Sequence, residues 1–132
     1  MKINDSNIKK AVKYLNNNEC IGIPTETVYG LAANAYSDKG TKKIFKLKGR
    51  PSNNPLIVHY YNIKDLEKDC ETNTLFYKLY NSLCPGPITF ILKLKNKSKI
   101  SKNVTNNKKT LGVRFPNHRT ARILLKSLKY PL

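Results

Sequence analysis

The chain has 132 residues, of which 39% are hydrophobic and 25% are charged. This length suits one domain with a single hydrophobic core, and this composition excludes an intrinsically disordered chain. The formal net charge of +17 favours a polyanionic partner such as a nucleotide, an RNA or a membrane surface. Lysine accounts for 21 of the 25 basic residues, as in proteins coded by AT-rich genomes, so the four arginines are the more informative cations.

Cysteine and histidine are too few and too scattered to build a metal centre. The three cysteines are odd in number and form no C-x-x-C pair, and the histidines are His59 and His118. These counts exclude a disulfide framework and a Cys/His zinc site, so we predict no protein-bound metal. No stretch approaches the roughly 20 apolar residues that cross a bilayer, and no apolar run follows the N-terminal lysine. We therefore expect a cytoplasmic protein without a membrane partner.

The first third of the sequence reads as a helix, a strand and a second helix. Apolar residues recur at helical spacing through residues 6–16, behind a predicted cap at Asp5 or Ser6. A short apolar run at 20–23 predicts a strand. A second helix is expected over 38–48, before a glycine and a proline that break helices.

The middle of the sequence alternates strands with a helix. Residues 56–60 are apolar and β-branched enough for a buried strand, whereas residues 74–83 return to helical spacing. A Cys-Pro-Gly-Pro turn at 84–87 ends that helix. Two further strands are expected at 88–94 and 111–115, because both segments are short apolar runs.

The last two expected elements are a polar connection and a terminal helix. Residues 95–109 have almost no apolar content and predict a hairpin-like excursion or a mobile loop. Apolar spacing at 117–129 predicts a helix with Asn117 as its N-cap. Strands interleaved with helices, without an internal repeat, indicate a single α/β or α+β domain.

Two motifs in the first half place polar side chains beside predicted strands. The first, PTETVYGL at 24–31, offers two hydroxyls, a carboxylate and a phenol to a ligand, although a plain polar strand exit looks the same. The second, IFKLKGRPSNNPLIVH at 44–59, holds Lys48 and Arg50 around a glycine in a proline-stiffened turn. Fixed cations of this kind suit phosphate groups, and a basic surface turn is the alternative. His59 is either a buried structural histidine or a ligand contact.

Two motifs in the second half centre on an arginine in a strand. CPGPITFIL at 84–92 is a rigid turn that feeds a strand, and TLGVRFP at 110–116 places Arg114 among apolar residues. An unpaired buried charge is costly, so Arg114 requires an anion. A structural ion pair and a substrate carboxylate both remain open as that anion.

The four motifs occur in the order and spacing of the YrdC family of threonylcarbamoyl-AMP synthases, which the chain resembles from about residue 8 onward. The resemblance implies a twisted open sheet of mixed strands flanked by helices, an α/β (α+β) fold, around a positively charged central cavity. It also implies a nucleotidyltransferase that makes threonylcarbamoyl-adenylate and pyrophosphate from L-threonine, bicarbonate and ATP, with Mg²⁺ expected on the triphosphate. A tRNA-modifying transferase would then carry the threonylcarbamoyl group to adenosine 37 of tRNA.

The resemblance also implies substrate contacts at the motif positions. Contacts to threonine are expected from Thr27, His59 and Arg114. Contacts to ATP are expected from Lys48, Arg50, Asn54 and Thr110, with Lys48 and Arg50 as electrostatic stabilisers. No protein nucleophile is required, because the carbamate of threonine itself attacks the α-phosphate.

The C-terminus departs from the family pattern. Family members continue past a segment like Tyr130-Pro131-Leu132 into a strand and a Ser-x-Asn motif that this sequence lacks. Residues 1–132 therefore read as a single, incomplete domain with an unpaired sheet edge and parts of both substrate sites missing. Catalysis by these residues alone stays open, as does a non-catalytic module that binds double-stranded RNA or tRNA. A synthase of carbamoyl-adenylate is a third reading, disfavoured by the lack of an acylphosphatase-like or zinc-finger segment.

Overall fold

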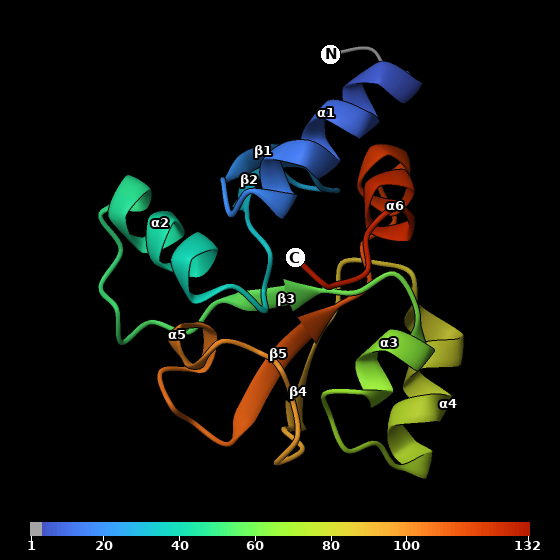
Figure 1. Cartoon of the computed structure of the whole chain (residues 1–132). Coiled ribbons are helices and arrows are strands. Elements are labelled where there is room, and N and C mark those ends of the chain that lie inside the picture. The colour runs from blue at the N-terminus through green and yellow to red at the C-terminus, as the bar shows by residue number, and fades with distance from the viewer. Residues whose placement is uncertain (1–3) are drawn as a thin grey trace.

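The computed structural model describes residues 4–132 as an α/β arrangement of helices around two small sheets (Figure 1). The helices are α1 (Asp5–Asn16), α2 (Asp38–Lys48), α3 (Ile63–Glu67), α4 (Thr74–Leu83), α5 (Lys102–Thr105) and α6 (Arg119–Lys126). The strands are β1 (Ile21–Pro24), β2 (Tyr29–Ala32), β3 (Ile57–His59), β4 (Thr89–Lys93) and β5 (Thr110–Arg114).

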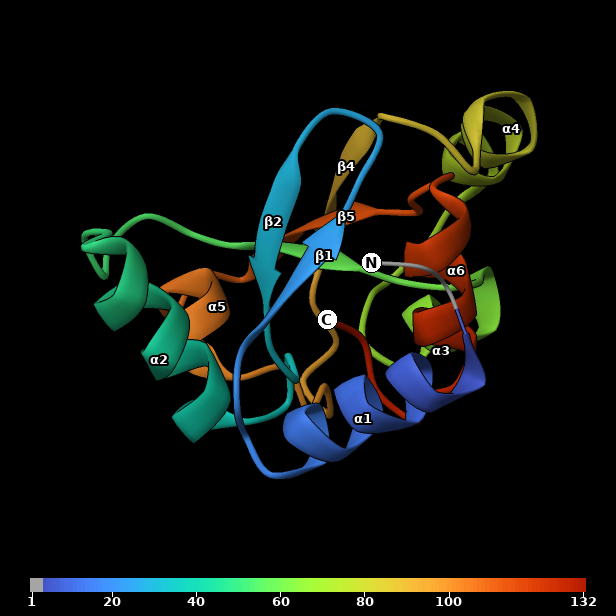
Figure 2. The ribbon, with the colours of Figure 1, turned by 90° about the horizontal axis from the view of Figure 1, so that it is seen from above.

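The larger sheet has the strand order β3-β5-β4, with β3 and β5 parallel and β4 and β5 antiparallel. Strands β1 and β2 form an antiparallel hairpin that lies over one side of this sheet (Figures 1 and 2). Mixed strand directions and an open sheet flanked by helices confirm the expected fold class.

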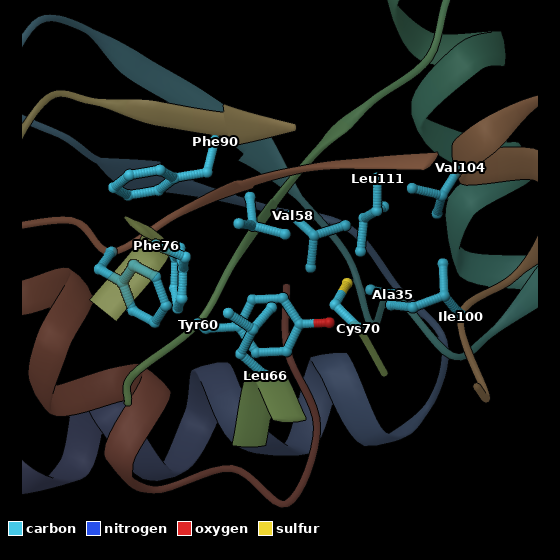
Figure 3. Packing of buried hydrophobic residues seen from close by; sticks show 12 residues of the cluster. Ala35, Val58, Tyr60, Leu66, Cys70, Phe76, Phe90, Ile100, Val104 and Leu111 are labelled. Atoms are coloured by element: carbon cyan, nitrogen blue, oxygen red, sulfur yellow. The ribbon is translucent and has the colours of Figure 1, made fainter. Parts of the chain in front are cut away.

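The main hydrophobic core lies on the other side of the larger sheet. Alternate residues of β5, Leu111 and Val113, point into it together with Val58 of β3. Figure 3 shows these side chains packed with Phe76 of α4 and Leu66 of α3. Burying apolar groups of this size contributes roughly 1.5–3 kcal/mol each. The packed face of the sheet therefore contributes substantially to the stability of the fold.

A second hydrophobic cluster holds the hairpin against α1 and α6. Leu15 of α1 and Leu124 of α6 are buried against Ile23 of β1 and Ala32 of β2. Because Ala32 pairs with Ile21 and Ile23 pairs with Gly30, the hairpin is held along its strands, while the turn at 25–28 projects beyond them (Figure 2).

Both predicted helix caps prove wrong by one or two residues. Helix α1 is capped by Asn4, whose side-chain oxygen accepts from the backbone N–H of Asn7. Helix α6 is capped by His118, because its Nδ1 accepts from the backbone N–H of Thr120. The backbone N–H of Asn117 lies before the helix and donates a hydrogen bond outside it.

The prediction of a polar excursion or mobile loop at 95–109 is wrong. The segment contains α5, and Ile100, Val104 and Thr105 are buried. The backbone N–H of Ser101 donates to the carbonyl of Ala35, and the backbone N–H of Leu56 donates to the carbonyl of Val104. The segment is therefore hydrogen-bonded to two other parts of the chain. A few well-placed apolar residues suffice to fix it.

Two short elements, β2 and α3, were not expected from the sequence. The other predicted helices and strands are confirmed within a few residues. The longest helix, α1, has 12 residues, and none of the helices formed by residues 4–132 is long and apolar enough to cross a membrane.

Candidate functional site

A cavity of about 270 Å³ lies between the β1–β2 hairpin, the end of α2 and strand β3. Thr25 and Leu31 line it from the hairpin. The side chains of Lys48, Arg50 and His59 line it from the opposite walls. No Asp or Glu side chain is among the described residues that line it, so its charged groups are cationic.

The end of α2 positions the two cations. Gly49 adopts a left-handed conformation with φ 58°, which ends the helix, and the backbone N–H of Arg50 returns to the carbonyl of Phe45. The Arg50 guanidinium donates to the carbonyl oxygens of Pro55 at 2.8 Å and Asn54 at 3.4 Å. Its remaining N–H groups stay available to an anion.

Strand register brings His59 and Arg114 together. Their Cα atoms are partners in the parallel β3–β5 pairing, and both side chains lie on the sheet face opposite the main core. Arg114 donates through Nε at 3.2 Å and Nη2 at 2.8 Å to the hydroxyl of Thr89, its partner on β4. The ion pairs formed within residues 4–132 do not involve Arg114. The ion-pair alternative for Arg114 therefore finds no protein carboxylate.

His59 is mostly buried and held neutral. Burial, reinforced by the nearby Arg114 charge, lowers its pKa to about 4, and Glu26 opposes this shift only in part. Its Nε2 atom is buried without a hydrogen-bond partner among the described residues. A buried nitrogen in this state costs free energy until a ligand satisfies it.

The edge of β3 is paired at His59 by the backbone of Leu132. The backbone N–H of His59 donates to the carbonyl of Leu132 at 2.6 Å, and the N–H of Leu132 donates back at 3.1 Å. This pair satisfies the edge at the residue that contributes to the cavity.

Four predicted site residues are not among the described residues that line the cavity: Arg114, Thr27, Asn54 and Thr110. Thr27 is exposed in the hairpin turn, and Asn54 is exposed in the loop that Arg50 holds. Thr110 begins β5 on the same face as Arg114, roughly 13 Å away at the usual rise per residue. The structure therefore brings together Lys48, Arg50 and His59, but places Thr27, Asn54 and Thr110 around them.

Three polar residues were not named individually as site residues from the sequence. Thr25 lines the cavity, Thr89 orients Arg114, and Glu26 accepts a hydrogen bond from Asn117. All three lie inside recognised motifs, but the partnership of Thr89 with Arg114 also required the β4–β5 register. Among residues 4–132, no three His, Cys, Asp or Glu side chains gather as a metal site would require.

Known proteins resemble this chain over its whole length. The family model described as "Telomere recombination", Sua5/YciO/YrdC, matches residues 13–132. The threonylcarbamoyl-AMP synthase of Bacillus subtilis is 39% identical over all of this chain and 38% of its own length. That of Pyrococcus abyssi is 33% identical over 99% of this chain and 38% of its own length. The chain thus spans somewhat more than a third of these relatives.

Solved structures agree with the sequence comparison. The crystal structure of P. abyssi Sua5 complexed with L-threonine superposes with a TM-score of 0.92 at 33% identity, covering 99% of this chain and 38% of that one. E. coli YciO, with a TM-score of 0.85 at 22% identity, covers 98% and 63% and shows the shared fold. The chain belongs to the Sua5/YciO/YrdC family.

Proposed function

We propose that this chain forms the substrate cleft of a threonylcarbamoyl-AMP synthase. The observation that carries the proposal is the pairing of Arg114 with His59, where a guanidinium without a carboxylate partner lies beside a buried, unpaired imidazole nitrogen. The carboxylate of an amino acid would give the Arg114 guanidinium an anion, and a neighbouring polar group of the same molecule would give His59 Nε2 a hydrogen-bond partner. The names of the bacterial and archaeal relatives support this choice of enzyme.

Threonine would bind at the Arg114 end of β5. Arg114 holds the carboxylate through the N–H groups that Thr89 leaves free, and His59 supplies a neutral nitrogen. Thr27, which is exposed in the hairpin turn, would complete this site. The L-threonine complex of P. abyssi Sua5, which aligns with nearly all of this chain, supports such a site.

ATP would bind beside threonine, toward Lys48 and Arg50. Asn54 belongs to the loop that Arg50 holds, and Thr110 stands on the same sheet face as Arg114. The separation of roughly 13 Å between Thr110 and Arg114 is enough to place two small substrates side by side. Magnesium enters with the triphosphate, since the cavity lining offers no carboxylate side chain to hold it as a resident ion.

The reaction then needs orientation and fixed charge. The threonine amine forms a carbamate, either with bicarbonate and loss of water or with carbon dioxide and release of a proton. An oxygen of this carbamate then attacks the α-phosphorus as the bond to pyrophosphate breaks. Orientation of reactants supplies roughly 7–11 kcal/mol in favourable systems. Lys48 and Arg50 stabilise the charge that develops on the leaving group. A tRNA-modifying transferase would take up the product.

The proposal is tested by measuring the binding of threonine and the binding of ATP separately. Arg114→Gln is expected to weaken threonine binding at least tenfold and to change ATP binding by less than about twofold, whereas Arg50→Gln does the reverse. Arg119→Gln, an exposed arginine outside the cavity, is the matched control. Calorimetry with each substrate alone measures these affinities. Equal losses in Arg114→Gln and Arg119→Gln would refute the assignment.

An activity assay identifies the acyl group. Pyrophosphate release from ATP should require both threonine and bicarbonate. Release that follows carbamoyl phosphate instead of threonine would favour the synthesis of carbamoyl-adenylate. The assay is run on the chain alone and on a relative of full length, because the chain spans about 38% of the relatives.

A second candidate function, binding of RNA, has its own observation. An open groove of about 990 Å³ lies between α2 and the segment around α5 (Figure 1). Lysines stand on both of its walls: Lys39 and Lys42 on α2, and Lys99 and Lys102 opposite. None of their ammonium groups has a partner in the described part of the chain. Two rows of cations suit a phosphodiester backbone.

Substitutions in the groove and in the cavity test which of the two binds RNA. If the groove binds RNA, Lys42→Gln with Lys102→Gln weakens the binding and lowers its salt dependence by about two phosphate contacts. Arg50→Ala, in the cavity, then leaves RNA affinity unchanged. The opposite pattern, a loss with Arg50→Ala alone, would place RNA in the cavity. Filter binding at several salt concentrations distinguishes the two.

A further inference from the structure

The turn of the β1–β2 hairpin is closed within itself. The Thr25 hydroxyl donates to the carbonyl of Val28 at 2.7 Å, and the Thr25 backbone N–H donates to the same oxygen at 3.1 Å. These bonds fix the shape of the turn. They do not fix where the turn lies relative to the sheet beneath it.

The hairpin has little packing near its turn. Val28 and Tyr29 are 68% and 75% exposed, so apolar burial does not hold them. A Cβ atom added to Gly22 or Gly30 would meet nothing within 4 Å. Ile23, which pairs with Gly30 and is buried in the cluster with α1 and α6, is the last buried side chain of β1 before the turn. The turn at 25–28 beyond it could therefore swing unless another contact restrains it.

Glu26 provides that contact. Its Oε1 accepts from the backbone N–H of Asn117 at 2.5 Å, across 91 residues of sequence. Within residues 4–132 it is the only hydrogen bond that joins the turn at 25–28 to another part of the molecule. The backbone N–H of Asn117 precedes the N-cap residue His118, so the helix offers it no acceptor.

The far end of this tether is firmly held. Asn117 follows Phe115 and Pro116, both buried, and the carbonyl of Phe115 accepts from Gly86. The carbonyl of Pro116 accepts from Arg122 at 3.2 Å. Arg114, the last residue of β5, lies three residues before Asn117, so the tether ends just beyond the end of that strand.

We propose that Glu26 is a positioning residue, which ties the turn carrying Thr27 to the end of β5 carrying Arg114. This inference rests on the proposed function, since it assigns the spacing of the two threonine contacts to one carboxylate. With the tether in place, the hairpin wall and the β5 wall hold a fixed gap. Without it, Thr27 moves with the turn and threonine meets a wider site, while Lys48 and Arg50 keep their places.

The experiment compares Glu26→Ala with Glu26→Gln, which keeps an oxygen acceptor. Glu71→Ala removes another exposed carboxylate, paired only with Lys93, and is the matched control. Hydrogen exchange at the Asn117 amide should accelerate about fivefold or more in Glu26→Ala, the loss expected for one hydrogen bond. Threonine affinity should fall by a similar factor in Glu26→Ala, with ATP affinity within about twofold of the parent chain.

Glu26→Gln should recover most of both effects, and the thermal midpoint of all variants should stay close to that of the parent chain. Unchanged exchange at Asn117 in Glu26→Ala would show that the tether does not form. Faster exchange with unchanged threonine affinity would show a tether without a positioning role. A parent chain that binds no threonine would overturn the proposed function and the positioning role together, while exchange at Asn117 still reports the tether.

Discussion

The two faces of the β3-β5-β4 sheet treat polar groups in opposite ways. On the packed face, buried Asp69 accepts from the hydroxyls of Tyr36 and Tyr60 at 2.8 Å each. Its other oxygen accepts from the Ser98 hydroxyl and the Lys99 backbone. On the open face, His59 Nε2 has no partner in the described residues.

The contrast separates groups that stabilise the fold from groups that are available to a ligand. Burial and the Asp69 carboxylate raise the pKa values of Tyr36 and Tyr60, so both stay protonated and keep donating. Arg114 donates two of its N–H groups to the Thr89 hydroxyl and none to a carboxylate of the described residues. Satisfied polar networks belong to the core, and incompletely satisfied ones mark the candidate site.

The largest expected effect tests the packed face. Asp69→Ala should lower the free energy of unfolding by about 3–5 kcal/mol, because it leaves several buried donors without an acceptor. Asp65→Ala, which loses an exposed pair with Lys68, should cost about 1 kcal/mol or less. Urea unfolding measures both. Similar losses in the two variants would break the contrast between the faces.

A smaller effect tests the open face through pH. The folded pKa of His59, about 4, lies below the ordinary value of 6.5, so the unfolded chain binds the proton more readily. The contribution of His59 to stability is therefore constant above pH 6.5 and falls as the pH drops toward 4, by about 1–3 kcal/mol. His59→Gln should flatten this part of the stability profile. An equally steep profile in His59→Gln would assign the loss to other groups.

The smallest effect compares two glycines. A Cβ at Gly112, on the open face, would meet side-chain atoms at 3.6–3.7 Å, which is ordinary contact. Gly112→Ala should therefore change stability by about 0.5 kcal/mol or less. At Gly86 the added atom would lie 2.6 Å from the carbonyl oxygen of Leu83, so Gly86→Ala should cost about 1–3 kcal/mol. Thermal unfolding measures both costs. Equal losses of stability in the two variants would mean that the open face around Gly112 is as tightly filled as the turn around Gly86.

Local patterns carried most of the secondary structure and part of the site. Helices α2 and α4 were predicted because apolar spacing and strong stop signals agree at their ends. Lys48, Arg50 and His59 fall within one continuous motif, and the structure places them around one cavity. The prediction for segment 95–109 was wrong because its buried apolar residues, Ile100 and Val104, are too few to indicate packing from the sequence.

Long-range pairs set the limit of prediction. The partnership of Arg114 with Thr89 follows from the β4–β5 register, which the sequence does not display. The bond from Asn117 to Glu26 joins residues 91 positions apart. Such contacts depend on how elements pack, so a motif identifies which residues matter but not what each one touches.

The parallel pairing of β3 with β5 also has a kinetic meaning. Ile57 pairs with Gly112, 55 positions further along, and three helices and a strand lie between them. Closing so long a loop is among the slow steps of folding, because its entropy is lost before its contacts form. His59 meets Arg114 only once this step is complete. Intermediates that already contain the local helices would therefore be unable to recognise a ligand, and binding would report the fully assembled chain.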